Sequence, residues 1–225
     1  MRRTIVGGMV ALCAAGAFPA RAAAADGEAP TVCIAPLGEH DRRLLPVVVR
    51  GIEYLYQLDV RVLAARPLPD SAWYQPRRRY RAEKLLAHLD AQVVPGSGCS
   101  VVMGFTGADI STTNHGRADW GMLGYAWIGG RSGVVSTYRL TRRVSRRAAA
   151  MRAVKVMNHE LGHALGLEHH DADGCLMKDL AGTVKTIDRQ SGLLCEDSRR
   201  AIEDLRGVDL PAHAAIDWRQ ILRRR

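Results

Sequence analysis

The stretch that decides the fold runs from residue 147 to residue 170 and reads RAAAMRAVKVMNHELGHALGLEHH. Its first part is rich in alanine, and apolar residues recur at helical spacing as far as Leu161. This pattern predicts one long helix over 147–165 with its apolar side in the core. Gly166 can adopt the left-handed conformation that ends a helix, so we expect the chain to turn back there.

Three histidines and a glutamate in this stretch have the spacing of a metal site. His159 and His163 are four residues apart, so on a helix they project from one face. The turn at Gly166 lets His169 reach the same ion from the following loop. Three neutral imidazoles leave one position open for water, as in a catalytic zinc site. Glu160 can take a proton from that water, which predicts hydrolysis of a peptide bond.

The same residues resemble those of a known clan of peptidases. The pattern HExxHxxGxxH, followed by Met177, is similar to that of the metzincins, in which a methionine turn underlies the metal. Within that clan the chain resembles the archaemetzincins, and looser similarity runs through residues 80–86, 104–110 and 134–140. The resemblance implies an α/β fold, a metzincin-like catalytic domain with a twisted, mostly parallel sheet, helices, and a small irregular and helical C-terminal subdomain.

The chain departs from the family at a second site. In archaemetzincins the motif continues as Cys-x4-Cys-Met and ends in a distant Cys-x-x-Cys, and these four cysteines bind a structural zinc. Here His170 stands at the first position and Ser198 at the fourth, while Cys175 and Cys195 remain. Serine is a poor zinc ligand, so we expect one catalytic zinc, although His170 and the two cysteines could still hold a second ion. The resemblance instead favours a Cys175–Cys195 disulfide that staples the same loop.

The first 25 residues predict a secretory signal peptide. Arg2 and Arg3 precede an apolar run over 5–20, and the alanines that follow offer cleavage points. The run is too short and too rich in glycine and alanine for a stable membrane span. We therefore expect a secreted or periplasmic protein without a stable membrane anchor, whose mature chain is a single catalytic domain over 26–225.

Four cysteines remain once the predicted signal peptide is removed. An even count in an exported protein suggests two disulfides, and four cysteines allow three pairings. With the Cys175–Cys195 pair that the resemblance favours, Cys33 would pair with Cys99 and join two neighbouring strands.

Outside the motif, short apolar runs alternate with helical patterns. We expect strands over 31–36, 60–64, 100–105, 121–128 and 133–140, helices over 41–58, 80–89 and 198–205, and loops over 66–76 and 109–120. This alternation predicts an α/β sandwich around a mostly parallel sheet, as an upper subdomain over about 26–166 above a lower one over about 167–225. The strand over 133–140 precedes the long helix, as a metzincin edge strand does, and such an edge can bind an extended peptide.

Composition limits the classes of partner. The 225 residues are 47% hydrophobic and 24% charged, which are ordinary values for a globular protein. The net charge of +9 could indicate nucleic-acid binding, but no nucleic-acid module accompanies it and aromatic residues are only 5%. We therefore expect a peptide or protein substrate and no nucleic-acid partner, with no indication of the oligomeric state.

One alternative from another class stays open. The chain could be a catalytically weak or inactive zinc-binding protein that holds a peptide or protein partner. Glu160 argues against this, because a pure binding site has no need of a base. Endopeptidase and aminopeptidase action are both compatible with the sequence, since no residue marks a site for a free amino terminus.

Overall fold

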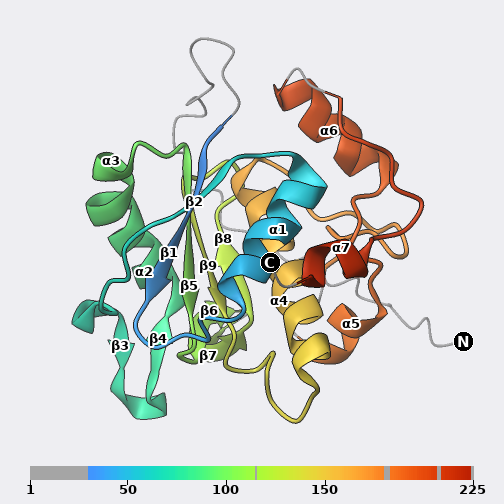
Figure 1. Ribbon diagram of the computed structural model, residues 1–225. Helices are drawn as coiled ribbons and strands as arrows, with labels where there is room; N and C mark the ends of the chain where they lie inside the picture. Colours follow the sequence, from blue (N-terminus) through green and yellow to red (C-terminus); the bar gives the residue numbers. More distant parts are fainter. Residues whose placement is uncertain (1–29, 115, 180–182, 207–208, 224–225) are drawn as a thin grey trace, which may run out of the picture.

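The computed structural model describes residues 30–114, 116–179, 183–206 and 209–223 (Figure 1). The predicted signal peptide, residues 1–25, lies outside the described residues. None of the helices in the described ranges combines the length and the apolar character that crossing a bilayer requires.

A five-stranded sheet forms the centre of the molecule. Its strands, in spatial order, are β2 (Val60–Val62), β1 (Val32–Leu37), β5 (Val101–Thr106), β9 (Ser132–Ser136) and β8 (Gly124–Ala126). The pairs β2–β1, β1–β5 and β5–β9 are parallel, and only β8 runs antiparallel to its neighbour. Every residue of β1, β5 and β9 is buried, as expected for strands covered on both faces. The prediction of a mostly parallel sheet is confirmed.

The edge of this sheet is not the strand that the sequence suggests. The prediction that residues 133–140 form an edge strand is wrong, because β9 lies between β5 and β8. A short connection lets the chain fold back, so that Gly124 pairs with Val135 and Ala126 with Gly133. The edge near the long helix is therefore β8.

A second, four-stranded sheet corrects another expectation. Its order is β3 (Trp73–Tyr74), β4 (Arg79–Arg81), β6 (Ile110–Asn114) and β7 (Arg117–Met122). The prediction of a loop over the polar residues 109–120 is wrong, because most of them belong to the β6–β7 hairpin. Only Ile110, Ser111 and Thr112 of β6 are buried, so the hairpin depends on cross-strand pairing more than on an apolar face. The predicted loop over 66–76 also contains β3.

The helices cover both faces of the central sheet (Figure 1). They are α1 (Leu45–Tyr56), α2 (Ala82–His88), α3 (Val94–Ser97), α4 (Arg146–Ala164), α5 (Val184–Arg189), α6 (Glu196–Arg206) and α7 (Trp218–Leu222), with the short helical turns η1 (Asp70–Ala72), η2 (Gln75–Arg77) and η3 (Leu89–Val93). In the figure α1 and α4 lie on one side of the sheet, and α2 and α3 on the other. The side chains of β1 alternate accordingly, since Val32 and Ile34 join the core with α1 and α4, while Cys33 faces η3.

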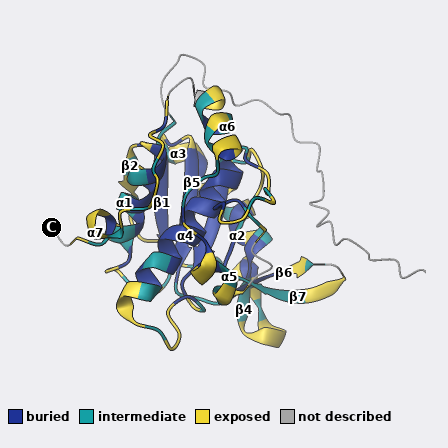
Figure 2. Ribbon diagram, turned by 90° about the vertical axis from the view of Figure 1, so that its right-hand side faces the viewer, coloured by how far each residue is buried: buried dark blue, intermediate teal, exposed yellow. Residues whose placement is uncertain are grey.

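Helix α4 is the central helix of the protein, and it begins with a side-chain cap. Ser145 accepts a hydrogen bond from the backbone N–H of Ala148 at 3.1 Å. All but one of the residues from Ala149 to Ala164 are buried; Met151 is partly exposed. Figure 2 shows this long buried stretch of α4, with exposed positions confined to its first turns. Helix α4 therefore has protein on nearly all sides, although it carries buried polar residues such as Arg152, Lys155 and Asn158.

The residues after α4 are helical and irregular, as the sequence indicates for the C-terminal part. The expected helix over 198–205 is present as α6, which begins two residues earlier. Helices α5 and α7 are not predicted from the sequence. They have only six and five residues, too few to establish a periodic pattern.

Candidate metal centre and active site

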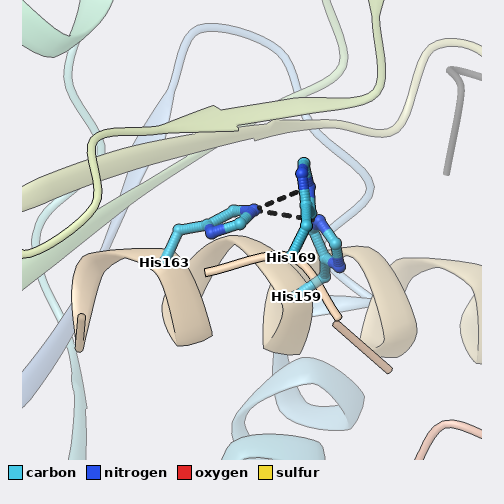
Figure 3. Close-up of side chains that lie close together, drawn as sticks. All are labelled: His159, His163 and His169. Atoms are coloured by element: carbon cyan, nitrogen blue, oxygen red, sulfur yellow. Dashed lines mark hydrogen bonds between the residues drawn. The ribbon is translucent and has the colours of Figure 1, made fainter. Parts of the chain in front are cut away.

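Three histidine side chains meet at the C-terminal end of α4. His159 and His163 project from consecutive turns of the helix and are buried, with 4% and 7% of their surface exposed. The Nε2 atom of His163 lies 3.1 Å from Nε2 of His159 and 3.2 Å from Nε2 of His169 (Figure 3). These three residues form a group whose nitrogen atoms are close enough to hold one metal ion.

Backbone carbonyl groups fix the protonation of two of these rings. His159 Nδ1 lies 2.7 Å from the carbonyl oxygen of Leu176, and His163 Nδ1 lies 2.8 Å from that of Leu167. A carbonyl oxygen can only accept, so each Nδ1 carries the hydrogen and each Nε2 of the neutral ring presents a lone pair. Two lone pairs 3.1 Å apart repel one another unless a cation lies between them.

The spacing of these nitrogens fits zinc. Zn–N bonds of about 2.0–2.1 Å in a tetrahedral site place neighbouring ligand nitrogens about 3.3 Å apart. The observed separations of 3.1 Å and 3.2 Å are close to that value. Burial also lowers the pKa of His159 to about 3 and that of His163 to about 4, and each is further lowered by a neighbouring imidazole. Both rings are therefore neutral at pH 7, as metal binding requires.

The third histidine, His169, reaches the site because α4 ends in a glycine turn that reverses the direction of the chain. Gly166 has a φ of 103°. Its N–H donates to the carbonyl of His163, and the N–H of Leu167 donates to that of Gly162, both at 2.9 Å. These two bonds make a Schellman motif, which requires the left-handed conformation that glycine adopts at low cost. The reversal brings His169, on the exposed loop, back to the two buried rings.

Glu160 is buried next to the histidines, with 8% of its surface exposed. Burial raises the pKa of its carboxyl group to about 8. Its space is made by Gly124 of β8, where an added Cβ would lie 2.6 Å from Glu160 Oε1. Gly124 is not among the residues predicted from the sequence; a glycine inside a strand, which often marks a close approach, is the signal that could have found it.

Met177 lies beneath the histidine-bearing helix. It is fully buried, and a Cβ added to Gly162 of α4 would lie 2.6 Å from its Sδ. The residue before it, Leu176, provides the carbonyl that fixes His159, and its N–H donates to the carbonyl of Leu193 at 2.8 Å. The segment at Met177 therefore packs against the part of α4 that carries the histidines, and the carbonyl group of Leu176 orients one of them.

The segment that carries Met177 is fastened by a disulfide between Cys175 and Cys195. His170 is close by, and its Nε2 lies 2.9 Å from a carboxylate oxygen of Asp197. The ligand atoms of His170 and the two cysteines are within 4.8 Å of one another, so they form a second group with the dimensions of a metal site. Ser198 Oγ is 3.3 Å from Cys195 Sγ. In the structure both sulfur atoms are used in the bond between them.

The other two cysteines also bond to one another. The Cys33–Cys99 disulfide links β1 to the segment just before β5, with Cα atoms 5.9 Å apart. It lies on the η3 side of the sheet, in a core cluster separate from the one that contains Met177. It therefore stabilises the sheet away from the histidines.

Comparison with known proteins identifies the family. The family model described as "Peptidase family M54" matches residues 72–204, which is more than half of the chain. The chain belongs to peptidase family M54. This is a family of zinc metallopeptidases, so the expectations of the archaemetzincin family and of a zinc metallopeptidase are confirmed.

Relatives of this M54 member are archaemetzincins. The archaemetzincin of Natronomonas pharaonis is 32% identical over 184 residues, covering 76% of this chain and 98% of the relative. That of Halobacterium salinarum is 30% identical over 179 residues, with the same coverage of 76% and 98%.

Solved archaemetzincin structures share the fold. The structure from Methanopyrus kandleri has a TM-score of 0.68 at 26% identity and covers 79% of this chain and 95% of its own. The structure from Archaeoglobus fulgidus, solved in complex with malonate, has a TM-score of 0.64 at 27% identity and covers 75% and 97%. The metzincin-like α/β fold predicted for this M54 member is therefore confirmed.

Proposed function

We propose that this chain is an exported zinc-dependent peptidase. His159, His163 and His169 hold the catalytic zinc, and Glu160 is the general base. One observation carries the proposal: three Nε2 atoms converge at 3.1 Å and 3.2 Å, and in two of the rings the carbonyl groups of Leu176 and Leu167 hold the hydrogen on the opposite nitrogen. A cation of the size of zinc satisfies this arrangement.

Glu160 moves the proton. The three imidazoles would hold a zinc ion, which would supply a Lewis acid for the peptide carbonyl and for the attacking water. The carboxylate of Glu160, held beside His159 and against Gly124, accepts a proton from that water and delivers it to the leaving nitrogen. Burial alone raises the pKa of this carboxyl group to about 8, which disfavours the ionised form that a base needs. A nearby zinc ion would lower it.

The substrate is a peptide in extended conformation. Strand β8 lies at the end of the central sheet and pairs only with β9 among the strands of that sheet, so its outer edge offers backbone groups to an added strand. Because Gly124 of this strand contacts Glu160, a peptide held along β8 passes the proposed base.

We also propose one zinc ion per chain and a location outside the cytoplasm. The Cys175–Cys195 bond occupies the sulfur atoms that a second zinc would need, and thiolates are the ligands that such structural sites use. Two disulfides suit an oxidising compartment, and the predicted signal peptide at residues 1–25 supplies the route.

The test uses the mature chain from residue 26, prepared in an oxidising compartment. Zinc content is measured by mass spectrometry of the metal, and activity by digestion of a proteome-derived peptide library. We expect about one zinc per chain, cleavage that a chelator abolishes and zinc restores, and loss of cleavage in Glu160→Gln with zinc retained. His163→Asn should lose zinc, whereas His88→Asn, outside the cluster, should keep it. A zinc-loaded wild type that cleaves no peptide would overturn the enzymatic proposal.

Export and the number of zinc ions have separate tests. Cell fractionation should find the full chain outside the cytoplasm and a chain lacking residues 2–25 inside it. Two zinc ions per chain in the oxidised protein would contradict the proposal of a single ion.

A further inference from the structure

A hollow of about 480 Å³ lies between the two sheets, and none of the three histidines lines it. Its lining comprises Trp73, Arg77, Arg78, Arg79, Tyr80, Gly107, Ala108, Asp109 and Tyr138. Residues 107–109 follow β5, and Tyr138 follows β9, so the hollow lies at the carboxyl ends of two parallel strands. Ligands of open α/β sheets bind at such ends. The volume is within the range of small ligand sites.

The hollow carries an excess of positive charge. Arg139 donates to both oxygens of Asp109, at 2.8 Å and 3.1 Å, so that this lining carboxylate is already matched. Asp119, a carboxylate outside the lining, lies 3.3 Å from Arg77 and 3.7 Å from Arg79. The lining itself holds three arginines, Arg77, Arg78 and Arg79, and one aspartate, Asp109, which leaves two positive charges in excess.

Arg78 is the cation most available to a ligand. It is exposed, and among the residues that the structure describes its side chain makes no hydrogen bond or ion pair. The neighbouring Arg79 is largely buried, and its Nε, 3.3 Å from Asp109, is without a hydrogen bond. Donors of this kind are suited to carboxylate oxygens, which arginine binds through paired N–H groups.

Aromatic side chains form part of the wall. Trp73 and Tyr138 are 38% and 41% exposed, although large apolar side chains are more often covered. Trp73 packs edge-on against Tyr80 with ring centroids 5.0 Å apart, so the wall is held in place. The combination of arginine donors and exposed rings suits a ligand with a carboxylate on an aliphatic stem, as in an acidic side chain. The three stretches of looser family similarity, 80–86, 104–110 and 134–140, all contribute to this lining.

The hollow is connected to the proposed substrate strand. The guanidinium of Arg139, which pairs with Asp109, lies in the space that a Cβ atom at Gly121 of β7 would occupy. Gly121 comes three residues before Gly124, which contacts Glu160. Leu123, which stands between them, is a bend at which the chain passes from the second sheet to the central one. The hollow therefore lies beyond the end of β8 that meets the proposed base, and Figure 1 shows β4, β6 and β7 gathered at that end of the central sheet.

We infer that this hollow is a subsite that binds an acidic side chain of the peptide substrate, at a position to one side of the scissile bond. The inference rests on the proposed peptidase function, because it takes the ligand to be part of the substrate. Arg78 provides the principal contact, and Trp73 and Tyr138 hold the aliphatic stem.

The binding test uses the full mature chain with Glu160→Gln, so that the probe is not cleaved. The probes are short fluorescein-labelled peptides that carry one glutamate at successive positions, each with a glutamine counterpart. We expect glutamate at one position to bind about threefold to fivefold tighter than glutamine, and added salt to reduce the preference. Arg78→Gln should abolish the preference, and Arg78→Lys should retain part of it.

Arg143→Gln is the matched control. Arg143 is also exposed and also left-handed, with φ 53° against 51° for Arg78, but it does not line the hollow. It should keep the full preference for glutamate. Equal binding of glutamate and glutamine probes at every position, or a preference that survives Arg78→Gln, would overturn the inference.

The same library digest separates this inference from the proposed function. If the active chain cleaves peptides but its preference for acidic residues is unchanged by Arg78→Gln, the subsite is wrong and the peptidase proposal stands. If the zinc-loaded chain cleaves nothing while the Glu160→Gln chain binds acidic peptides through Arg78, the peptidase proposal is wrong and the acidic binding site stands.

Discussion

Gly124 of the edge strand lies against the carboxyl group of Glu160, so closely that a Cβ atom at residue 124 would stand 2.6 Å from Oε1 and 2.8 Å from Cδ. Real Cβ atoms do not approach other heavy atoms to this distance. The carboxyl group of the proposed base therefore has its position because the strand proposed to hold the substrate has no side chain there. The backbone of β8 at Gly124 and the side chain of Glu160 therefore pack directly against one another.

The first prediction concerns this contact. Gly124→Ala should displace the Glu160 carboxyl group and lower kcat/KM by about a hundredfold, since a misplacement of about 1 Å at a reacting group costs that much. Overpacking should also cost about 1–3 kcal/mol of stability. Peptide hydrolysis and urea unfolding measure the two effects.

Gly96→Ala is the matched control, because a Cβ at Gly96 meets nothing within 4 Å. It should leave hydrolysis unchanged. A Gly124→Ala variant with wild-type kcat/KM would show that the base does not depend on this contact.

The second prediction concerns the pH dependence of the metal-free chain. Burial raises the pKa of Glu160 from 4.5 to about 8, so the folded state keeps a proton that the unfolded state has released between these values. Stability contributed by this group therefore falls as pH rises from 4.5 to about 8. Glu160→Gln should be more stable than wild type above about pH 8, by on the order of 5 kcal/mol, and the difference should vanish near pH 4.5. Urea unfolding of both proteins across this pH range measures the difference in their free energies of unfolding. A difference that does not change with pH would contradict the prediction.

The third prediction concerns acid. Burial lowers the pKa of His159 and His163 from 6.5 to about 3 and about 4, so the unfolded state binds protons in this window that the folded state does not. Stability is therefore lost as pH falls from 6.5 toward about 4. The metal-free His163→Gln variant should show a shallower loss than wild type, whereas His88→Asn should show the full loss. Thermal unfolding of the three proteins gives the slopes, and equal slopes for all three would refute the assignment.

The fourth prediction concerns the two disulfides. Replacing Cys175 and Cys195 with alanine opens a loop of 20 residues and should cost about 3 kcal/mol, and it should also weaken zinc binding. The reason is that Leu176, whose carbonyl orients His159, is adjacent to Cys175 in the stapled segment.

Replacing Cys33 and Cys99 with alanine is the comparison. The sequence separation is 66 residues, so the expected cost is larger, about 4 kcal/mol, yet zinc affinity should stay at the wild-type value. Unfolding measurements and zinc titration separate the two effects. Equal zinc affinities in both double variants would show that the Cys175–Cys195 bond does not support the metal site.

Much of the proposed metal site follows from local geometry. Residues four apart on a helix lie on one face whatever surrounds the helix, so His159 and His163 are placed as soon as the helix is recognised. The return of the chain to His169 depends on Gly166, and the requirement for positive φ at a helix end is also local. The amino-acid sequence alone is therefore enough to identify these residues.

The edge strand and the second sheet could not be predicted in the same way. Residues 133–140 resemble an edge strand only until the preceding residues are seen to fold back on them, and the polar stretch 109–120 becomes strand through the β6–β7 pairing. Pairing between segments is decided by the whole fold, because a strand gains its hydrogen bonds from a partner and not from itself.

The sequence by itself determined the helix, the three histidines, the glutamate and the family to which they belong, because helix periodicity and a glycine turn act over a few residues. Only the tertiary structure decided that Leu176 orients His159, that Gly124 makes room for Glu160, and that three arginines and two exposed rings line one hollow. These contacts join residues that are far apart in the chain, and packing, which brings them together, is a property of the folded molecule.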